Sequence, residues 1–470
     1  MKTQKITQIF NICCIGAGYV GGPTMAVLAD NNPELRITVV DTSKEKIDLW
    51  NSEDLNDLPI YEPGLKEIVL KNRNINLFFS SNIPSSIEKA DMVFISVNTP
   101  TKKKGFGAGF ASDLKYVESS ARQVAKFSKG HTIVVEKSTL PVKTAQTIKS
   151  ILEAYKVKGD GEKKSFDILS NPEFLAEGTA INDLKKPDRV LIGGENEDAI
   201  NLLKKIYLNW VDENKILTTD LWSSELSKLI SNAFLAQRIS SINSISALCE
   251  VTQANIHNVS KAIGMDHRIG SEFLNPGPGF GGSCFKKDIA NLIYICNHYG
   301  LHEVASYWEK VIVINNWQQK RISRVIVEKL FGNLSEKKIA ILGFAFKSNT
   351  NDTRESPAIS ICRDLLEEGC YLSIYDPKVN TKQIKSELNN EQYKKDIFWE
   401  NCSNLEDALF NADAMVVLTD WCEFNNLDLK KIFEIMRYPS WIFDTRNIID
   451  PYLAESFGFN IWKLGNGFYN

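Results

Sequence analysis

The residues with the clearest chemical potential lie in a glycine-rich run, residues 275–288, which ends in a cysteine and an aspartate. The run reads Asn-Pro-Gly-Pro-Gly-Phe-Gly-Gly-Ser-Cys-Phe-Lys-Lys-Asp. Glycines let the main chain approach a ligand closely, and two lysines and a possible helix N-terminus beside Cys284 would favour its nucleophilic thiolate. Many cysteines are nevertheless small buried hydrophobes. The residues alone therefore leave a catalytic thiol and a structural cysteine as alternatives for Cys284.

A second chemical signal is a glycine fingerprint at residues 16–21, which reads Gly-Ala-Gly-Tyr-Val-Gly directly after the apolar run 12–15. Asp41 ends the next apolar run, about twenty residues further on, which is the context that a dinucleotide site requires. The glycines would admit a pyrophosphate at a helix N-terminus. The Asp41 carboxylate would accept hydrogen bonds from the adenosine ribose and repel a 2′-phosphate, which favours NAD over NADP. A glycine-rich turn that serves packing alone is the alternative.

The elements that must position these motifs alternate between strand and helix in both halves of the chain. Short β-branched runs predict strands at 12–15, 37–40, 92–97, 132–135 and 166–169, and again at 338–342, 372–375, 414–418 and 441–443. Such alternation is typical of parallel sheets with right-handed crossovers. Between the halves, apolar residues at helical spacing predict one long helix from about 222 to 249, capped by Ser223 or Ser224.

We therefore predict an α/β protein with two Rossmann-like, doubly wound parallel-sheet domains joined by a long central helix and a helical middle region. The predicted domains are an NAD-binding domain over 1–220, a central helical domain over 221–330 that carries the cysteine loop and a dimer contact, and a C-terminal nucleotide-sugar domain over 331–470. The run 338–347, a strand followed by a loop with one glycine, is a weak nucleotide signal by itself.

The composition excludes several classes of binding partner. With 55 basic and 58 acidic residues the formal charge is -3, which gives no field suited to nucleic acid or an anionic membrane. The nine cysteines show no C-x-x-C spacing, so we expect neither a disulfide framework nor a metal site. No window reaches the ~18 apolar residues of a membrane helix. We expect a cytoplasmic protein.

Taken together, the motifs resemble the UDP-glucose/GDP-mannose dehydrogenase family. Besides 16–21 and 275–288, the resemblance rests on residues 61–65, 95–101, 136–139, 171–178, 223–250, 342–347 and 352–356, which cover nearly the whole chain in the expected order. The resemblance implies an enzyme that uses two NAD molecules to oxidise the C6 alcohol of a nucleotide sugar to an acid. Cys284 would hold the aldehyde as a thiohemiacetal and then as a thioester, which water hydrolyses.

The resemblance also implies a role for individual residues. Lys228 would stabilise the oxyanion, with Asn232 one helical turn further on. Asp288 would act as a base, while Glu173 and Thr139 would hold the hydrolytic water. The catalytic residues implied are Cys284, Lys228, Asp288, Glu173, Thr139 and Asn232. The cofactor-binding residues implied are Gly16, Gly18, Tyr19, Val20, Gly21, Asp41, Lys46, Val97, Thr99, Thr139, Glu177, Lys287 and Arg354. The substrate-binding residues implied are Glu173, Phe174, Leu175, Lys228, Asn232, Arg268, Phe273, Asn275, Phe280, Gly281, Phe285, Phe346, Lys347 and Arg446.

Alternatives remain for one substrate contact and for the reaction. Asn275 departs from the lysine that some animal relatives carry, which puts one sugar- or phosphate-side contact in doubt. The favoured reaction converts UDP-glucose to UDP-glucuronate. The same chemistry on GDP-mannose or UDP-N-acetylmannosamine, a two-electron hydroxyacid dehydrogenase and a non-catalytic dinucleotide-binding protein are the alternatives. We also expect a homodimer or a higher homo-oligomer, in which Arg268 reaches a neighbouring subunit's site.

Overall fold

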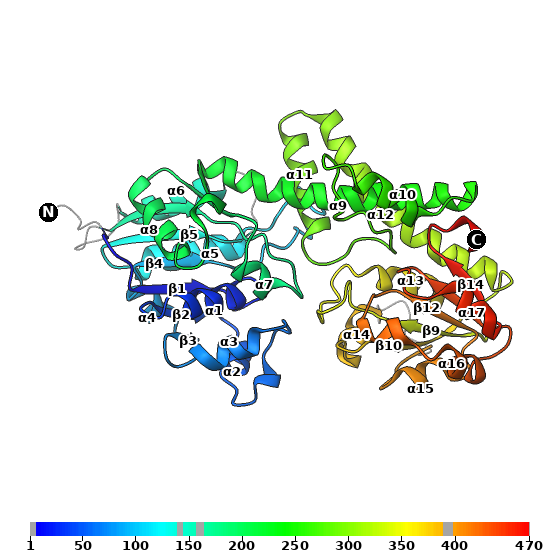
Figure 1. Ribbon diagram of the computed structural model, residues 1–470. Helices are drawn as coiled ribbons and strands as arrows, with labels where there is room; N and C mark the ends of the chain where they lie inside the picture. Colours follow the sequence, from blue (N-terminus) through cyan, green and yellow to red (C-terminus); the bar gives the residue numbers. More distant parts are fainter. Residues whose placement is uncertain (1–5, 139–143, 157–163, 389–397, 470) are drawn as a thin grey trace. The chain divides into compact units, whose positions relative to one another are not determined.

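The computed structural model describes residues 6–138, 144–156, 164–388 and 398–469 of the chain (Figure 1). The chain folds into two compact units. Unit 1 comprises residues 1–231 and 290–299, and unit 2 comprises residues 232–289 and 300–470. The helices α9 (Leu221–Thr252) and α11 (Phe285–His298) each contribute residues to both units.

Unit 1 is built on an eight-stranded sheet with the order β3-β2-β1-β4-β5-β6-β7-β8. Its strands are β1 (Asn11–Ile15), β2 (Arg36–Val40), β3 (Leu77–Ser80), β4 (Met92–Ile95), β5 (His131–Glu136), β6 (Ser165–Ser170), β7 (Val190–Gly194) and β8 (Ile216–Thr219). All neighbours pair in parallel except β6 and β7. The helices of this unit are α1 (Gly21–Asn31), α2 (Lys44–Trp50), α3 (Leu65–Asn72), α4 (Ile83–Glu88), α5 (Lys115–Phe127), α6 (Thr144–Lys156), α7 (Ala180–Lys185) and α8 (Glu197–Tyr207), with 3-10 turns η1 (Leu55–Asp57) and η2 (Glu213–Lys215).

The core of unit 1 lies on both faces of this sheet. On β1, Ile12 and Cys14 belong to one buried apolar cluster, whereas Cys13 and Ile15 belong to another. Successive side chains of a strand point to opposite faces, so a strand with helices on both faces is apolar throughout. This explains why the short continuous apolar runs in the sequence predicted strands correctly.

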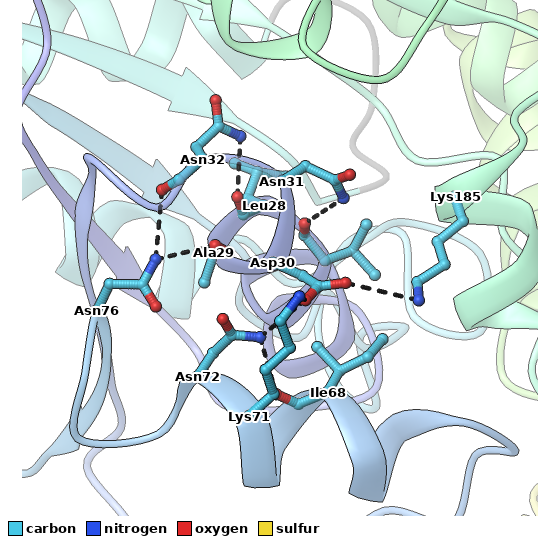
Figure 2. A network of polar contacts seen from close by, with 11 residues as sticks. Leu28, Ala29, Asp30, Asn31, Asn32, Ile68, Lys71, Asn72, Asn76 and Lys185 are labelled. Atoms are coloured by element: carbon cyan, nitrogen blue, oxygen red, sulfur yellow. Dashed lines mark hydrogen bonds and ion pairs between the residues drawn. The ribbon is translucent and has the colours of Figure 1, made fainter.

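A polar network anchors the C-terminal end of α1 (Figure 2). Asn76 donates to the backbone carbonyl of Ala29 at 2.9 Å, which satisfies one of the acceptors that every helix end leaves open. Asp30 lies at the negative end of the helix dipole, and Lys71 on α3 and Lys185 on α7 face its carboxylate at 2.6 and 3.6 Å. These contacts tie α1, α3 and α7 together at the end opposite the glycine fingerprint.

Unit 2 carries a second sheet, with six parallel strands in the order β11-β10-β9-β12-β13-β14. These strands are β9 (Lys338–Leu342), β10 (Tyr371–Tyr375), β11 (Trp399–Asn401), β12 (Ala414–Val417), β13 (Trp441–Asp444) and β14 (Asn460–Lys463). Its remaining helices are α10 (Ile256–Gly264), α12 (His302–Lys329), α13 (Pro357–Glu367), α14 (Thr381–Leu388), α15 (Leu405–Leu409), α16 (Leu429–Ile435) and α17 (Pro451–Phe457), with η4 (Cys422–Asn426) and η5 (Gly467–Tyr469).

The two sheets confirm the predicted doubly wound α/β class. Six strands of unit 1 and all six of unit 2 follow the order 3-2-1-4-5-6 that defines a Rossmann-type sheet. Two details of the prediction were wrong. The strand expected over 92–97 ends at Ile95. The central helix begins at Leu221, and its first turn is held by the Asp220 carboxylate, which accepts from the backbone of Ser223 at 2.8 Å, rather than by a serine cap.

Candidate active site

The glycine fingerprint lies between the end of β1 and the start of α1, as predicted. Gly16 has a φ of +112°, and a Cβ there would lie 2.1 Å from the carbonyl oxygen of Ser96, which follows β4. A Cβ on Gly21 would lie 2.0 Å from the oxygen of Gly16, so this residue permits close packing of strand, loop and helix. At Gly18, in contrast, no heavy atom of the described residues lies within 4 Å of an added Cβ, its own chain neighbours aside. The middle glycine therefore borders open space, which suits close approach of a ligand.

Asp41, at the end of β2, organises this loop from the side. Its carboxylate accepts from the backbone N–H groups of Ala17 and Ser43, both at 3.0 Å, and Lys46 lies 3.0 Å away. Partial burial would raise the pKa of Asp41, but these hydrogen bonds and the Lys46 ammonium outweigh it and hold the pKa below its ordinary value. A permanent negative charge therefore stands beside the fingerprint, where an adenosine ribose would bind.

Two further segments complete this edge of the unit 1 sheet. Val97 follows β4, and its carbonyl accepts from the Ser138 hydroxyl after β5 at 2.7 Å. Thr139, the next residue, lies outside the described residues. The strand order reverses between β1 and β4, and ligands of open α/β sheets bind at such a reversal, beyond the carboxyl ends of the strands.

A buried carboxylate that the sequence reasoning did not single out holds the turn beside Glu177. Glu62 accepts from the backbone of Gly178 at 2.6 Å and of Ala180 at 3.2 Å. The motif 61–65 pointed to this segment but not to its role, because the partner lies 116 residues away in the chain.

Glu173 and Lys228 form a buried ion pair within unit 1. The Lys228 Nζ lies 3.5 Å from Glu173 Oε1, and both side chains are only 5% exposed. Glu173 Oε2 is also buried, and it has no hydrogen-bond partner among the described residues. Because buried polar atoms are normally satisfied, this oxygen is suited to accept from a water or a substrate hydroxyl.

Two cationic side chains lie over the ring of Phe174. The Arg189 guanidinium lies 3.8 Å from the ring centroid, and the Lys228 ammonium lies 5.5 Å from it. Burial lowers the pKa of Arg189. Such contacts fix the orientation of ring and cation together. Arg189 was not predicted, because an arginine after a proline and an aspartate carries no spacing signal.

Cys284 directly precedes α11 in unit 2. Its carbonyl accepts the Asp288 N–H at 2.9 Å, so the thiol stands at the first turn of that helix, as the sequence suggested. Asp288 is buried, and its carboxylate accepts from Asn232 on α9 at 2.6 Å and lies 3.6 Å from the Lys287 ammonium. The Ser283 hydroxyl lies 3.6 Å from the Cys284 sulfur. The start of α11 thus carries a thiol and a carboxylate, and an amide from α9 binds the carboxylate.

Three glycines of the cysteine loop, Gly277, Gly281 and Gly282, lie against residues of the C-terminal sheet region of unit 2. A Cβ on Gly282 would lie 3.0 Å from the Phe346 ring, and one on Gly277 would lie 3.1 Å from a guanidinium nitrogen of Arg446. Burial lowers the pKa of Arg446. The Gly282 N–H donates to the carbonyl of Arg354 at 2.9 Å. These predicted residues, which lie far apart in sequence, are therefore neighbours.

Other predicted residues make different contacts. Arg268 is exposed and pairs with Asp266 at 2.6 Å, on the loop after α10. Phe273 and Asn275 are also exposed. Phe285 packs edge-on against Phe280, with ring centroids 5.9 Å apart.

The predicted site residues divide between the two units. In unit 1 lie Gly16, Gly18, Tyr19, Val20, Gly21, Asp41, Lys46, Val97, Thr99, Glu173, Phe174, Leu175, Glu177 and Lys228. In unit 2 lie Asn232, Arg268, Phe273, Asn275, Phe280, Gly281, Cys284, Phe285, Lys287, Asp288, Phe346, Lys347, Arg354 and Arg446.

The described residues contain neither a metal-binding cluster nor a membrane-spanning helix. Among them, no three His, Cys, Asp or Glu side chains are grouped so that they could hold a metal ion. No helix in this part of the chain combines the length and the apolar character needed to cross a membrane.

Fold and site together define a dinucleotide-binding α/β protein of the dehydrogenase class. Profiles of the UDP-glucose/GDP-mannose dehydrogenase family match in three parts: the NAD binding domain over residues 10–211, the central domain over 222–317 and the UDP binding domain over 340–451. The chain belongs to this family, and its cofactor is NAD.

Individual relatives are similar over almost their full length. The chain is 54% identical to the UDP-glucose 6-dehydrogenase of Drosophila melanogaster, over 97% of this chain and 96% of that one. It is 52% identical to UDP-glucose 6-dehydrogenase 3 of Oryza sativa subsp. japonica, with the same coverage. Among solved structures, a UDP-glucose dehydrogenase from Pyrobaculum islandicum is 28% identical with a TM-score of 0.82, covering 98% of this chain and 99% of that one. A UDP-D-ManNAc dehydrogenase from Pyrococcus horikoshii is 27% identical with a TM-score of 0.79, covering 97% and 100%.

Proposed function

We propose that this protein oxidises UDP-glucose to UDP-glucuronate in an NAD-dependent, four-electron reaction that passes through covalent intermediates on Cys284. The observation that carries the mechanism is the position of Cys284 at the start of α11, with the Asp288–Asn232 pair one turn away. The relatives named UDP-glucose 6-dehydrogenase, at 54% and 52% identity, support the choice of sugar.

The chemistry explains why a thiol is needed. In the first oxidation, the C6 alcohol loses a proton and a hydride and becomes an aldehyde. The Cys284 thiolate then adds to the aldehyde carbon to give a thiohemiacetal, and loss of a second hydride gives a thioester. Water adds to the thioester carbon, the C–S bond breaks, and the acid and the thiolate are released. NAD, when bound, accepts the hydride of each oxidation.

The side chains around these steps have matching charges. The buried Lys228 ammonium would stabilise the negative oxygen that develops at C6 in each addition. The unsatisfied Oε2 of Glu173 would hold the hydrolytic water. The Asp288 carboxylate, fixed by Asn232 at 2.6 Å, would take up protons.

The remaining residues would bind the two nucleotides. The Gly18 position, which borders open space, and the Asp41 carboxylate fit the pyrophosphate and the adenosine ribose of NAD. In unit 2, Phe346, Lys347 and Arg446 would hold the UDP moiety, since a guanidinium suits phosphate. The relative that acts on UDP-D-ManNAc makes another nucleotide sugar the second candidate substrate.

A stoichiometric assay tests the proposal. Purified protein is mixed with NAD and UDP-glucose, and NADH is counted per sugar consumed. We expect two NADH per sugar and no free aldehyde. A ratio of one, or turnover only with GDP-mannose or UDP-N-acetylmannosamine, would contradict the four-electron reaction or the sugar, respectively.

Replacing the thiol tests the covalent route. We expect Cys284→Ser to lose complete oxidation, with turnover reduced by more than about 10³-fold, because an ester is less reactive than a thioester. Cys422→Ser, which changes an exposed cysteine of the same chain, is the matched control and should retain full activity. Full four-electron turnover by Cys284→Ser would remove Cys284 from the mechanism.

We further infer a cytoplasmic homo-oligomer in which Arg268 serves a neighbouring subunit. In the described part of the chain, which holds all nine cysteines, none forms a disulfide, which fits a reducing compartment. Arg268 is exposed, and its guanidinium pairs with Asp266 of its own loop, so it is accessible to a second copy. Mixing Arg268→Ala with Cys284→Ser subunits should restore activity if the arginine acts between subunits. If the activity of the mixture does not exceed that of either variant alone, Arg268 does not act on a neighbouring subunit.

A further inference from the structure

The main chain of the cysteine loop is held by buried side-chain amides rather than by other backbone. Among the described residues, no backbone–backbone hydrogen bond involves residues 275–281, and the first of the run is donated by Gly282. A glycine-rich segment without such bonds has many accessible conformations. A fixed position for Cys284 therefore requires other contacts.

Three carboxamides supply these contacts. Asn315 on α12 accepts from the Phe280 N–H at 2.8 Å and donates to the Phe280 carbonyl at 3.1 Å, so one side chain satisfies both polar groups of that residue. Asn243 on α9 accepts from the Gly277 N–H at 2.9 Å, and Gln318 on α12 donates to the Gly277 carbonyl at 3.0 Å. All three side chains are buried, with exposures of 0 to 4%.

The glycine at position 279 shows how closely the loop follows α12. Gly279 has a φ of +132°, and a Cβ there would lie 2.8 Å from the Asn315 oxygen. On its other side, the loop meets Phe346, because a Cβ on Gly281 would lie 2.8 Å from the Phe346 Cβ. The loop thus lies between the amide side chains and the residues proposed to bind substrate.

We propose that Asn315, with Gln318 and Asn243, is a positioning residue that sets the path of the cysteine loop and so presents the Cys284 sulfur to the C6 carbon of the substrate. The proposal rests on the proposed function of Cys284. Asn315 acts through Phe280, four residues before Cys284, and a displacement of the order of 1 Å at a reacting atom is enough to reduce the rate strongly.

The decisive variant is Asn315→Asp. It keeps an acceptor for the Phe280 N–H but places a carboxylate oxygen against the Phe280 carbonyl, which repels it. We expect kcat with UDP-glucose to fall about 10- to 100-fold, the alkylation of Cys284 by iodoacetamide to slow by a similar factor, and KM for NAD to stay within about two-fold. Asn316→Asp adds the same charge to the next, exposed position of α12 and should match the wild type.

A second variant covers the case in which Asn315→Asp does not fold. Gln318→Glu also loses the donor to the Gly277 carbonyl, but Arg321 already donates to the Gln318 oxygen at 3.2 Å and would compensate the new charge. It should show the same loss of kcat and of Cys284 alkylation at an unchanged melting temperature.

The outcomes separate the two proposals. Wild-type kcat and wild-type alkylation of Cys284 in a folded Asn315→Asp or Gln318→Glu protein would overturn the positioning role and leave the proposed function standing. Wild-type protein without turnover of any nucleotide sugar would overturn the proposed function instead. A loss of kcat together with a matching loss of NAD binding would also contradict the positioning role, because it would indicate general damage.

Discussion

Glu173 and Lys228 place two opposite charges where almost no water reaches them. Withdrawal of both charges from water costs free energy that their attraction recovers only in part, so such a pair is weak evidence of a stabilising role. One oxygen of Glu173 has no protein partner in the described part of the chain, which a purely structural pair would not require. The pair is better explained by chemistry, with Phe174 and Arg189 fixing the lysine.

At the residue scale, Lys228→Met tests this explanation. The variant keeps the length and apolar stem of the side chain but removes the charge opposite Glu173. We expect kcat to fall by about 10²- to 10³-fold, as for other removed oxyanion donors. Steady-state kinetics with saturating NAD and UDP-glucose measure this loss.

The control for Lys228→Met is Lys204→Met, which removes the ammonium of a paired lysine at the surface of the same unit. Such surface pairs contribute about 0–1 kcal/mol, so kcat should not change. Equal activity of both variants would exclude Lys228 from the reaction.

At the element scale, the glycines of the fingerprint loop between β1 and α1 have different tasks. Gly21 is needed for packing, and Gly18 borders the space for a ligand. We expect Gly21→Ala to lower the free energy of unfolding by about 1–3 kcal/mol or more, since the added methyl group meets main chain. Gly18→Ala should leave stability unchanged and raise KM for NAD. Thermal unfolding and NAD titration of the two variants separate these effects. A loss of stability in Gly18→Ala, or a raised KM for NAD without a loss of stability in Gly21→Ala, would contradict this division of tasks.

A second element-scale feature is a pair of carboxyl groups between β5 and α9. Burial, followed by the charge and hydrogen bond of Glu225, raises the pKa of Glu136 well above its ordinary value. Glu225 also accepts from the backbone of Ala145 on α6 at 2.8 Å, so the pair connects three elements.

This pair predicts a pH dependence of stability. The folded state keeps the Glu136 proton to higher pH than the unfolded chain, whose glutamate pKa is about 4.3. The free energy of unfolding therefore falls as pH rises above that value, until the folded pKa is passed. Glu136→Gln carries no such proton. The melting temperature of this variant relative to that of the wild type should therefore rise between pH 5 and pH 8. Glu153→Gln, an exposed position on α6, should not. Parallel curves for Glu136→Gln and wild type would contradict the raised pKa.

At the scale of the whole molecule, the two sheets share one strand order, yet only the first has the three-glycine fingerprint. The second sheet has a single glycine after β9, Gly343, whose φ is +92°, and a Cβ there would lie 2.3 Å from the Cβ of Thr419. This difference fits one sheet for a dinucleotide and one for another nucleotide. The shared topology creates the same kind of crevice twice, and the loops decide what binds there.

Also at this scale, exposed apolar side chains on the second half of α9 support the inferred homo-oligomer. Ile245, Leu248 and Val251 repeat at helical spacing and are 40–75% exposed, which is typical of an interface. We expect Leu248→Glu to lower the mass measured by light scattering towards that of a monomer. Phe331→Glu, a similarly exposed position that follows α12, should leave the mass unchanged. An unchanged mass for Leu248→Glu would contradict an interface on this face.

The sequence by itself determined the features that depend on neighbouring residues. Apolar runs predicted the central strands, because a strand buried on both faces must be apolar throughout. Glycine spacing followed by Asp41 predicted the fingerprint, and the structure adds that Asp41 holds the loop through Ala17. The strands β3, β7, β8, β11 and β14 were not predicted. In β8 and β11 at most one residue is buried, so these two strands carry little apolar signal.

Only the tertiary structure decided which distant residues meet. Asn232 and Asp288 are 56 residues apart and lie on different helices, and the amide of Asn315 reaches Phe280 from a third. No local pattern encodes such pairs, because they depend on how helices pack rather than on the period of one helix. Family resemblance gave roles to several of these residues, but none to Glu62, Arg189 or Asn315. The roles of Glu62 and Asn315 follow from burial, which forces each polar group to find a specific partner.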